Sequence, residues 1–117
     1  MTIHAFLKDV GLSPNLLGYH YLGRAIELAM DKFKAKDYNF SYTVIYKDIA
    51  DEMNTTSSRV ERAIRHVIEL AFNTHEKKLY DMFGELISTY SGKVTNSCFI
   101  ATVAEYFLKN EVANRNK

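Results

Sequence analysis

The sequence has few of the residues that interrupt or cross-link a protein chain. Its 117 residues include one proline, five glycines and one cysteine. The single cysteine, Cys98, excludes an internal disulfide, and because no secretory signal pattern follows Met1 we expect a cytoplasmic protein. Few proline and glycine breaks favour helices joined by short turns over a many-stranded sheet. We therefore expect an all-α fold, a compact single-domain helical bundle of about six helices over residues 1–117.

An excess of charge of either sign is also missing. Fifteen Lys and Arg oppose fourteen Asp and Glu, for a net charge of +1, which argues against a basic nucleic-acid coat or an acidic mimic. Charged residues interrupt every hydrophobic stretch before the roughly 18 to 20 residues that a membrane span needs, so we expect no membrane partner. Residues 1–58 hold 6 Lys and Arg and 7 Asp and Glu, against 9 and 7 in the rest. Any nucleic-acid contact is therefore expected to be local and in the second half.

Motifs of enzymes, nucleotide sites and metal centres are missing too. None of the glycines belongs to a dinucleotide-binding or phosphate-binding loop, and no Gly-x-Ser-x-Gly elbow occurs. The four histidines lack the spacing of a helix-borne metal site, and Cys98 has no cysteine companion for zinc. Beside Phe99, Cys98 is more typical of a small buried hydrophobe than of a nucleophile. We therefore predict a protein that is not an enzyme and uses no metal or cofactor.

Cap residues and apolar spacing predict where the helices lie. Thr2 is expected to cap a short first helix that ends before Gly11. Ser13 before Pro14 predicts the start of a long second helix that reaches about residue 36. Residues 37–46 alternate polar and apolar side chains, but a lone strand has no partner, so we expect a loop and the approach to a third helix there, with a marginal hairpin in part of the segment as the alternative. Further helices are expected at residues 47–53, 57–72 and 77–86 and from Thr95 or Asn96 onward.

Residues 47–72 have the layout of a helix-turn-helix. Ala50 is small where two helices cross, and Asn54 suits the sharp turn because asparagine tolerates a left-handed backbone. Thr55 and Thr56 offer cap oxygens for the second helix, and Ser58 with Glu61 has the spacing of a capping box. One face of that helix is expected to be a buried apolar stripe of Val60, Ile64, Val67, Ile68 and Ala71.

The opposite face of this second helix is polar and positively charged. Within residues 58–66 three arginines against one glutamate give +2: Arg59, Arg62, Arg65 and Glu61. A major groove admits such a helix, arginine pairs with guanine, and glutamate accepts from the cytosine amino group. Glu61 and Arg62 therefore suit neighbouring base pairs, and Arg59 and Arg65 suit backbone phosphates. The same pattern also fits a solvated face on a protein that binds no DNA.

The stretch from Asn54 to Glu69, NTTSSRVERAIRHVIE, resembles the recognition helix of a known family. This is the DNA-binding effector domain of the sporulation-initiation response regulator (stage zero sporulation protein A) of endospore-forming bacteria. Further similar stretches, in the same order, cover nearly the whole chain: Ile3-His4, Val10-Gly11, Gly18-Tyr19, Tyr21-Leu22, Ala25-Ile26, Asp48-Ile49-Ala50, Phe83-Gly84, Thr95-Asn96-Ser97 and Phe99-Ile100-Ala101. The chain departs from the family at Lys47 and Val94, where proline is usual.

The resemblance implies a transcription regulator, activator or repressor, that acts at the nucleoid. It implies an all-helical effector domain that binds double-stranded DNA at a TGTCGAA-like element, commonly in tandem copies. The effector domain accounts for all 117 residues, so no receiver domain is expected. The alternative is a protein-interaction module of the same fold that has lost specific DNA binding and pairs with full-length relatives.

The same resemblance implies roles for individual residues. By position, the base readers are Glu61, Arg62 and Arg65. The implied DNA-backbone contacts are Thr56, Ser58, Arg59 and His66. In the family, the stretch just after the recognition helix contacts the sigma subunit of RNA polymerase. The residues here that start this stretch, and are implied to make the contact, are His75, Glu76, Lys77 and Lys78. The last helix resembles the family's self-association surface, so a homodimer or a tandem dimer on DNA is expected.

Overall fold

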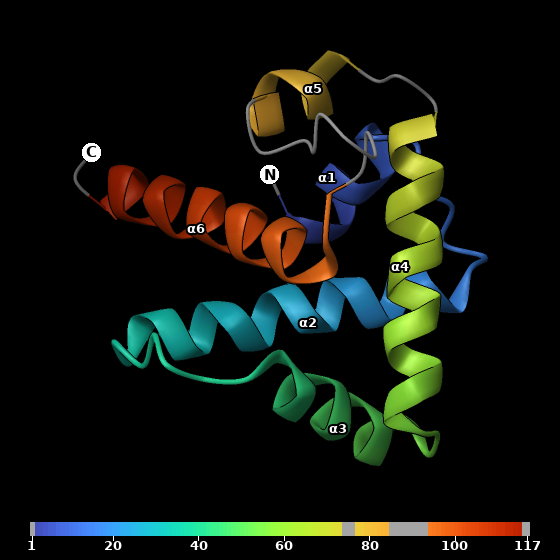
Figure 1. Cartoon of the computed structure of the whole chain (residues 1–117). Coiled ribbons are helices and arrows are strands. Elements are labelled where there is room, and N and C mark those ends of the chain that lie inside the picture. The colour runs from blue at the N-terminus through green and yellow to red at the C-terminus, as the bar shows by residue number, and fades with distance from the viewer. Residues whose placement is uncertain (1, 74–76, 85–93, 116–117) are drawn as a thin grey trace.

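The computed structural model describes residues 2–73, 77–84 and 94–115, which form six α-helices and no strand (Figure 1). This confirms the predicted all-α bundle. The helices are α1 (Ile3–Asp9), α2 (Leu17–Lys34), α3 (Tyr42–Met53), α4 (Ser57–Asn73), α5 (Lys77–Phe83) and α6 (Asn96–Arg115).

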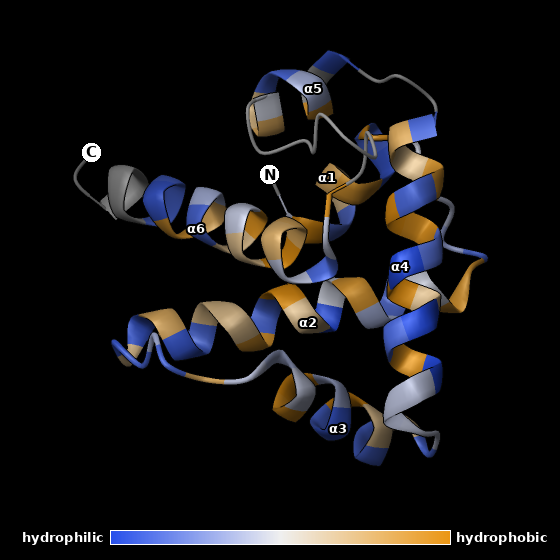
Figure 2. Cartoon of the chain, in the orientation of Figure 1, coloured by the Kyte–Doolittle hydropathy of each residue, from blue (hydrophilic) through white to orange (hydrophobic). Residues whose placement is uncertain are grey.

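The long helix α2 is the centre of the bundle, and it packs against α1, α3, α4 and α6. In Figure 1, α6 and α3 lie on opposite sides of α2, and α4 stands across one end of the α2–α6 pair. Among the described residues every buried side chain is hydrophobic. Figure 2 shows hydrophobic and hydrophilic residues alternating along α4, and the hydrophobic ones Val60, Ile64 and Val67 are among the buried residues. The fold therefore presents one face of α4 to solvent and anchors the other.

The first two helices differ in how well their starts are predicted. The Thr2 hydroxyl accepts the Ala5 N–H at 3.0 Å, which confirms the predicted cap of α1. The predicted start of α2 was wrong by three residues, because Ser13 caps a local turn instead: its hydroxyl accepts the Asn15 N–H at 3.2 Å. Helix α2 then begins at Leu17 without a side-chain cap.

Helix α3 begins at Tyr42, five residues before the predicted start. The Ser41 hydroxyl accepts the Thr43 N–H at 3.2 Å and so caps the helix. Ile45, Tyr46 and Ile49 are buried together on one face. The alternation in residues 37–46 therefore ends in a helix. Ile45 and Ile49 are four residues apart, and this spacing puts two residues on one face both in a strand and in a helix.

The last two helices pack through aromatic rings. The ring of Phe83 in α5 stacks on Phe99 of α6 at 5.1 Å between centroids. Thr95 caps α6, since its hydroxyl accepts the Cys98 N–H at 3.2 Å, which settles the two predicted alternatives. The predicted helix at 77–86 ends at Phe83 in the structure, and its last two residues lie outside the described part of the chain.

Helices α2 and α4 approach each other closely at Gly18. A Cβ atom at this position would lie 2.8 Å from Val67 Cγ1 and would overlap the carbonyl oxygen of Ala63. The absence of a side chain therefore sets the distance between the central helix and α4. From sequence, Gly18 is only a weak point in a helix, whereas in the fold it is a packing requirement.

An ion pair joins α2 to the first helix of the helix-turn-helix. Arg24 Nε and Nη2 each donate to the Glu52 carboxylate at 2.9 Å. The hydrogen bond from Arg24 holds the pKa of Glu52 below its ordinary value of 4.5. The pair is partly exposed, with 40% of the Glu52 side chain accessible, so its contribution to stability is about 0.2–1 kcal/mol.

The Glu52 pair predicts a pH-dependent stability term. A carboxyl pKa that is lower in the folded state than in the unfolded state stabilises the fold at pH values above the ordinary pKa. This stabilisation is lost as the pH falls through the lower folded-state pKa. We expect Arg24→Met to lose stability at pH 7 and to fall less than the wild type on acidification, in urea melts from pH 7 to pH 3. Lys47→Met, at the more exposed pair with Asp51, is the control and should follow the wild type. Parallel pH profiles for Arg24→Met and wild type would contradict this assignment.

Candidate nucleic-acid interface

The turn between α3 and α4 has the geometry that its sequence predicts. Asn54 adopts the left-handed conformation, with φ 55° and ψ 52°. The N–H groups of Asn54 and Thr55 both bond the carbonyl of Ala50, the latter at 2.9 Å. These bonds close the end of α3 and reverse the chain within three residues, so α3 and α4 form the predicted helix-turn-helix.

Thr56 caps α4, and the predicted Ser58–Glu61 capping box is wrong. The Thr56 hydroxyl accepts the Arg59 N–H at 3.2 Å, and its carbonyl accepts the Val60 N–H at 3.1 Å. Ser58 already lies inside the helix, where its side chain cannot take the cap position. The Glu61 carboxylate lies 3.4 Å from Arg65 Nη1 instead.

The inner face of α4 is the predicted apolar stripe. Its members are each at most 1% exposed: Val60, Ile64, Val67, Ile68 and Ala71. Phe72 extends the buried face by one residue. Because this stripe packs against the bundle, the rotation of α4 is fixed and its other face is held toward solvent.

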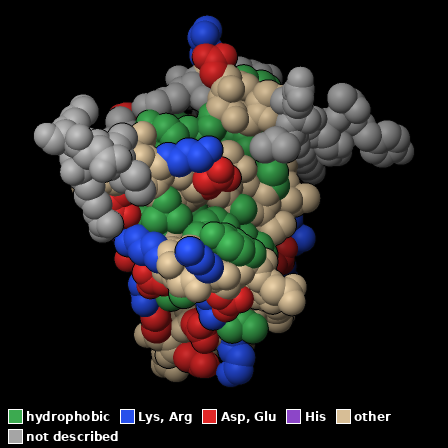
Figure 3. All heavy atoms as spheres, turned by 90° about the vertical axis from the view of Figure 1, so that its left-hand side faces the viewer, with side chains coloured by type: hydrophobic (Ala, Val, Ile, Leu, Met, Phe, Trp, Pro, Cys, Tyr) green, Lys and Arg blue, Asp and Glu red, His purple; other side chains and the backbone are tan. Residues whose placement is uncertain are grey.

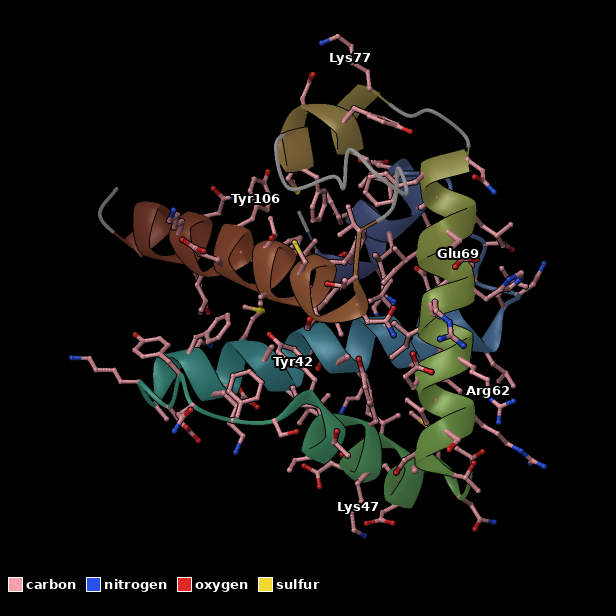
Figure 4. All side chains as sticks on the ribbon, in the orientation of Figure 1. Tyr42, Lys47, Arg62, Glu69, Lys77 and Tyr106 are labelled. Carbon is pink, nitrogen blue, oxygen red and sulfur yellow. The ribbon has the colours of Figure 1, made fainter. Side chains whose placement is uncertain are left out.

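The outer face of α4 brings together the residues that the sequence singles out. Ser58, Arg59, Arg62, Arg65 and His66 are exposed, and the Glu61 side chain is half-buried at 34% accessibility. Arg62 points away from the rest of the molecule in Figure 4. Within the part of the chain that the structure describes, Arg59 and Arg62 form no ion pair, whereas Arg65 pairs with Glu61. Two arginines are therefore available for an external anion without breaking an ion pair.

A groove runs beside this face, between α4 and the N-terminal ends of α3 and α6. Its larger part has a volume of about 760 Å³ and is lined by groups that include Tyr42, Tyr46 and Asn96. The part nearest the α4 N-terminus is about 470 Å³. Glu61 and Arg65 line both parts. Burial raises the pKa of the Tyr42 and Tyr46 hydroxyls, so both remain neutral at physiological pH.

The sequence prediction missed one contact in this groove. Asn96 was expected only as a possible cap of the last helix, a role that Thr95 fills. Its Nδ2 donates instead to the main-chain carbonyl of Glu61 at 3.1 Å. Nothing in the local pattern around residue 96 indicates a partner that lies 35 residues away.

Residues 3–107 match the family model described as sporulation initiation factor Spo0A C terminal. The match covers nearly the whole chain. The chain belongs to this family. It is therefore a DNA-binding effector domain of a sporulation regulator, with double-stranded DNA as its partner, and the predicted family resemblance is confirmed. In this Spo0A C-terminal domain, α4 holds the position of the recognition helix.

Of the four predicted sigma-subunit residues, the structure describes the placement of Lys77 and Lys78, which belong to α5. His75 and Glu76 fall outside the described residues. Lys77 begins α5, and its exposed ammonium group lies 2.8 Å from Asp81. Lys78 follows it in α5. Helix α5 lies beyond the C-terminal end of α4, at the far end from the helix-turn-helix turn (Figure 1). Lys77 and Lys78 therefore belong to a helix that lies away from the turn between α3 and α4.

The face of the Spo0A domain turned away from α4 has no single charge sign. Figure 3 shows Lys and Arg there interspersed with Asp and Glu around hydrophobic side chains. At the end of α2, Lys32 pairs with Asp37 at 3.6 Å and Lys34 pairs with Glu111 at 3.4 Å. Among the described residues no three His, Cys, Asp or Glu side chains group as metal ligands. None of the described helices has the length and apolar composition to cross a membrane.

Proposed function

We propose that this Spo0A C-terminal domain binds double-stranded DNA sequence-specifically, by inserting α4 into the major groove of a TGTCGAA-like element. The observation that carries the proposal is the sidedness of α4. Its apolar stripe is buried against the bundle, and its opposite face exposes three arginines within seven residues, from Arg59 to Arg65. A helix held in this way presents side chains to base edges at a fixed depth and rotation.

Charge and contact geometry divide the α4 residues into two groups. Arg62, exposed and without an ion-pair partner among the described residues, is the guanine reader, and Glu61 accepts from a cytosine amino group. Arg65 completes the base-reading set beside its partner Glu61, at 3.4 Å. The other group contacts the DNA backbone: Thr56, Ser58, Arg59 and His66. These contacts position the helix without reading sequence.

The remaining partners follow from the family. Residues 1–117 act as one effector domain, and two copies on tandem sites associate through α6. Residues 75–78 and the start of α5 contact the sigma subunit of RNA polymerase, by which the domain activates or represses transcription at the nucleoid. The separation of α5 from the α3–α4 turn in Figure 1 supports this division, because a surface beyond the end of α4 stays clear of bound DNA.

Fluorescence anisotropy with a labelled TGTCGAA duplex and a scrambled duplex of the same composition tests the proposal. We expect a preference of at least about ten-fold for the cognate duplex, which corresponds to 1.4 kcal/mol. Tandem sites should bind more tightly than one site, because each bound neighbour raises the local concentration of the next. Equal affinity for the cognate and scrambled duplexes would reject the proposal and favour the protein-interaction module.

A further inference from the structure

Three helices meet at a polar junction beside the recognition face. Asn96, the first residue of α6, donates from Nδ2 to the main-chain carbonyl of Glu61 in α4 at 3.1 Å. The half-buried amide also interacts with Tyr46 of α3, and this interaction partly offsets the rise that burial causes in the pKa of the Tyr46 hydroxyl. Asn96, Tyr46 and Glu61 all line the same groove. One side chain thus links both helices of the helix-turn-helix to α6.

The partner of Asn96 is a main-chain atom, and this has a mechanical consequence. The Glu61 carbonyl lies inside α4, where its helical bond goes to the N–H of residue 65. A carbonyl oxygen has two lone pairs, so it accepts the Asn96 amide as well. Apolar packing of the buried stripe restrains the rotation of α4 broadly, whereas a hydrogen bond loses strength within a few tenths of an ångström. The bond therefore restrains how far α4 turns and slides.

Glu61, whose main-chain carbonyl accepts the bond from Asn96, also carries its carboxylate beside the outer face of α4. The Glu61 carboxylate pairs with Arg65 at 3.4 Å, and both side chains line the groove next to Asn96. A shift of the α4 backbone at Glu61 moves these two side chains together. Base hydrogen bonds tolerate such displacements poorly, whereas contacts to phosphates by long, mobile cations tolerate them better.

We propose that Asn96 is a positioning residue for base reading, which holds the α4 backbone at Glu61 so that Glu61 and Arg65 meet base edges. This inference rests on the proposed sequence-specific binding. It predicts that Asn96 governs the preference between DNA sequences more than the affinity for DNA in general. The residue itself makes no contact with DNA in this role.

Two variants and a neighbour test this role. Asn96→Asp keeps the size of the side chain and removes its N–H donors, and Asn96→Ala removes the bond without adding charge. Ser97→Ala is the matched control, because the Ser97 hydroxyl lies 3.4 Å from Thr95 Oγ1 in the same groove and is not the α4 anchor. We expect both Asn96 variants to reduce the ratio of cognate to scrambled affinity by about three- to ten-fold, the effect of one hydrogen bond. Ser97→Ala should keep the wild-type ratio.

The ratio separates positioning from other effects. The added charge of Asn96→Asp weakens binding to every duplex and cancels in the ratio, and Asn96→Ala lacks that charge. A wild type without any cognate preference defeats the proposed function itself. If the wild type prefers the cognate duplex and both Asn96 variants keep the full ratio, the positioning role alone is overturned.

A measurement without DNA tests the positioning directly. In ¹H–¹⁵N spectra of the free protein, the amides from Glu61 to Arg65 should shift in Asn96→Ala and stay in place in Ser97→Ala. The Arg65 amide should move most, because its N–H shares the carbonyl that Asn96 bonds. Unchanged α4 amides in a folded Asn96→Ala variant would overturn the inference whatever the DNA results are.

Discussion

Replacing Arg62 with alanine is expected to cost about 1–3 kcal/mol of binding free energy on the cognate duplex and much less on a scrambled one. Arg62 lies on the exposed face of α4, and among the described residues its Nε donates to the Ser58 carbonyl of its own helix, at a long 3.4 Å. That weak bond is readily exchanged for a bidentate contact with guanine. The loss should appear as relaxed discrimination at one guanine position in anisotropy titrations of single-substituted duplexes.

Arg59→Ala is the matched control for Arg62→Ala. It removes the same charge from the same exposed face one turn earlier, next to the Thr56 cap. As a phosphate contact, Arg59 should contribute to all duplexes alike, so its removal should weaken cognate and scrambled binding by the same factor. Equal losses of affinity on both duplexes for Arg62→Ala would show that Arg62, like Arg59, contacts the DNA backbone and does not read a base.

Replacing Gly18 with alanine is expected to destabilise the fold by about 1–3 kcal/mol, because the added methyl group overpacks the contact between α2 and α4. The new Cβ would overlap the Ala63 carbonyl oxygen and would lie 2.8 Å from Val67 Cγ1. A main-chain carbonyl within a helix cannot rotate aside, so the two helices must separate. Urea unfolding followed by far-UV circular dichroism measures the loss, and cognate DNA affinity should fall with it because α4 moves.

Gly23→Ala distinguishes a packing effect from the ordinary effect of glycine in a helix. The atoms nearest to a Cβ at Gly23 would belong to the ring of His4, the closest at 3.2 Å, and this exposed side chain can shift. Alanine favours a helix over glycine by about 1 kcal/mol, so Gly23→Ala should leave the protein as stable as the wild type or more so. A Gly18→Ala protein that is also as stable as the wild type would contradict the close approach of α2 and α4.

The parts of the fold that local chemistry decides were predictable from the sequence. Thr2, Asn54 and the apolar stripe of α4 act through residues within a few positions of themselves, and their predicted roles are confirmed. The starts of α2 and α3 were missed because Ser13 and Ser41 are both good caps, and only packing decides which one begins a helix. Ser13 caps a turn, and Ser41 caps α3.

The exposed face of α4 was predictable for the same reason, since helical spacing alone separates its buried and exposed residues. The contact of Asn96 with Glu61 was not predictable, because it joins two helices through a main-chain carbonyl that carries no sequence signature. The Glu61–Arg65 pair has an i,i+4 spacing that a sequence reveals, yet the capping-box pattern at Ser58 pointed to a different partner for Glu61. Polar contacts between residues far apart in the sequence can therefore be identified only once the fold is known.

Base reading by α4 is tested most directly by an anisotropy titration of the wild-type domain with cognate and scrambled duplexes over a series of salt concentrations. Few cations face the DNA, so log Kd for each duplex should rise with log salt at a shallow slope, equivalent to about two to four phosphate contacts. The preference for TGTCGAA should persist at every salt concentration, because base hydrogen bonds from Glu61, Arg62 and Arg65 release no counterions. Binding curves for the two duplexes that coincide throughout the series would contradict base reading by α4.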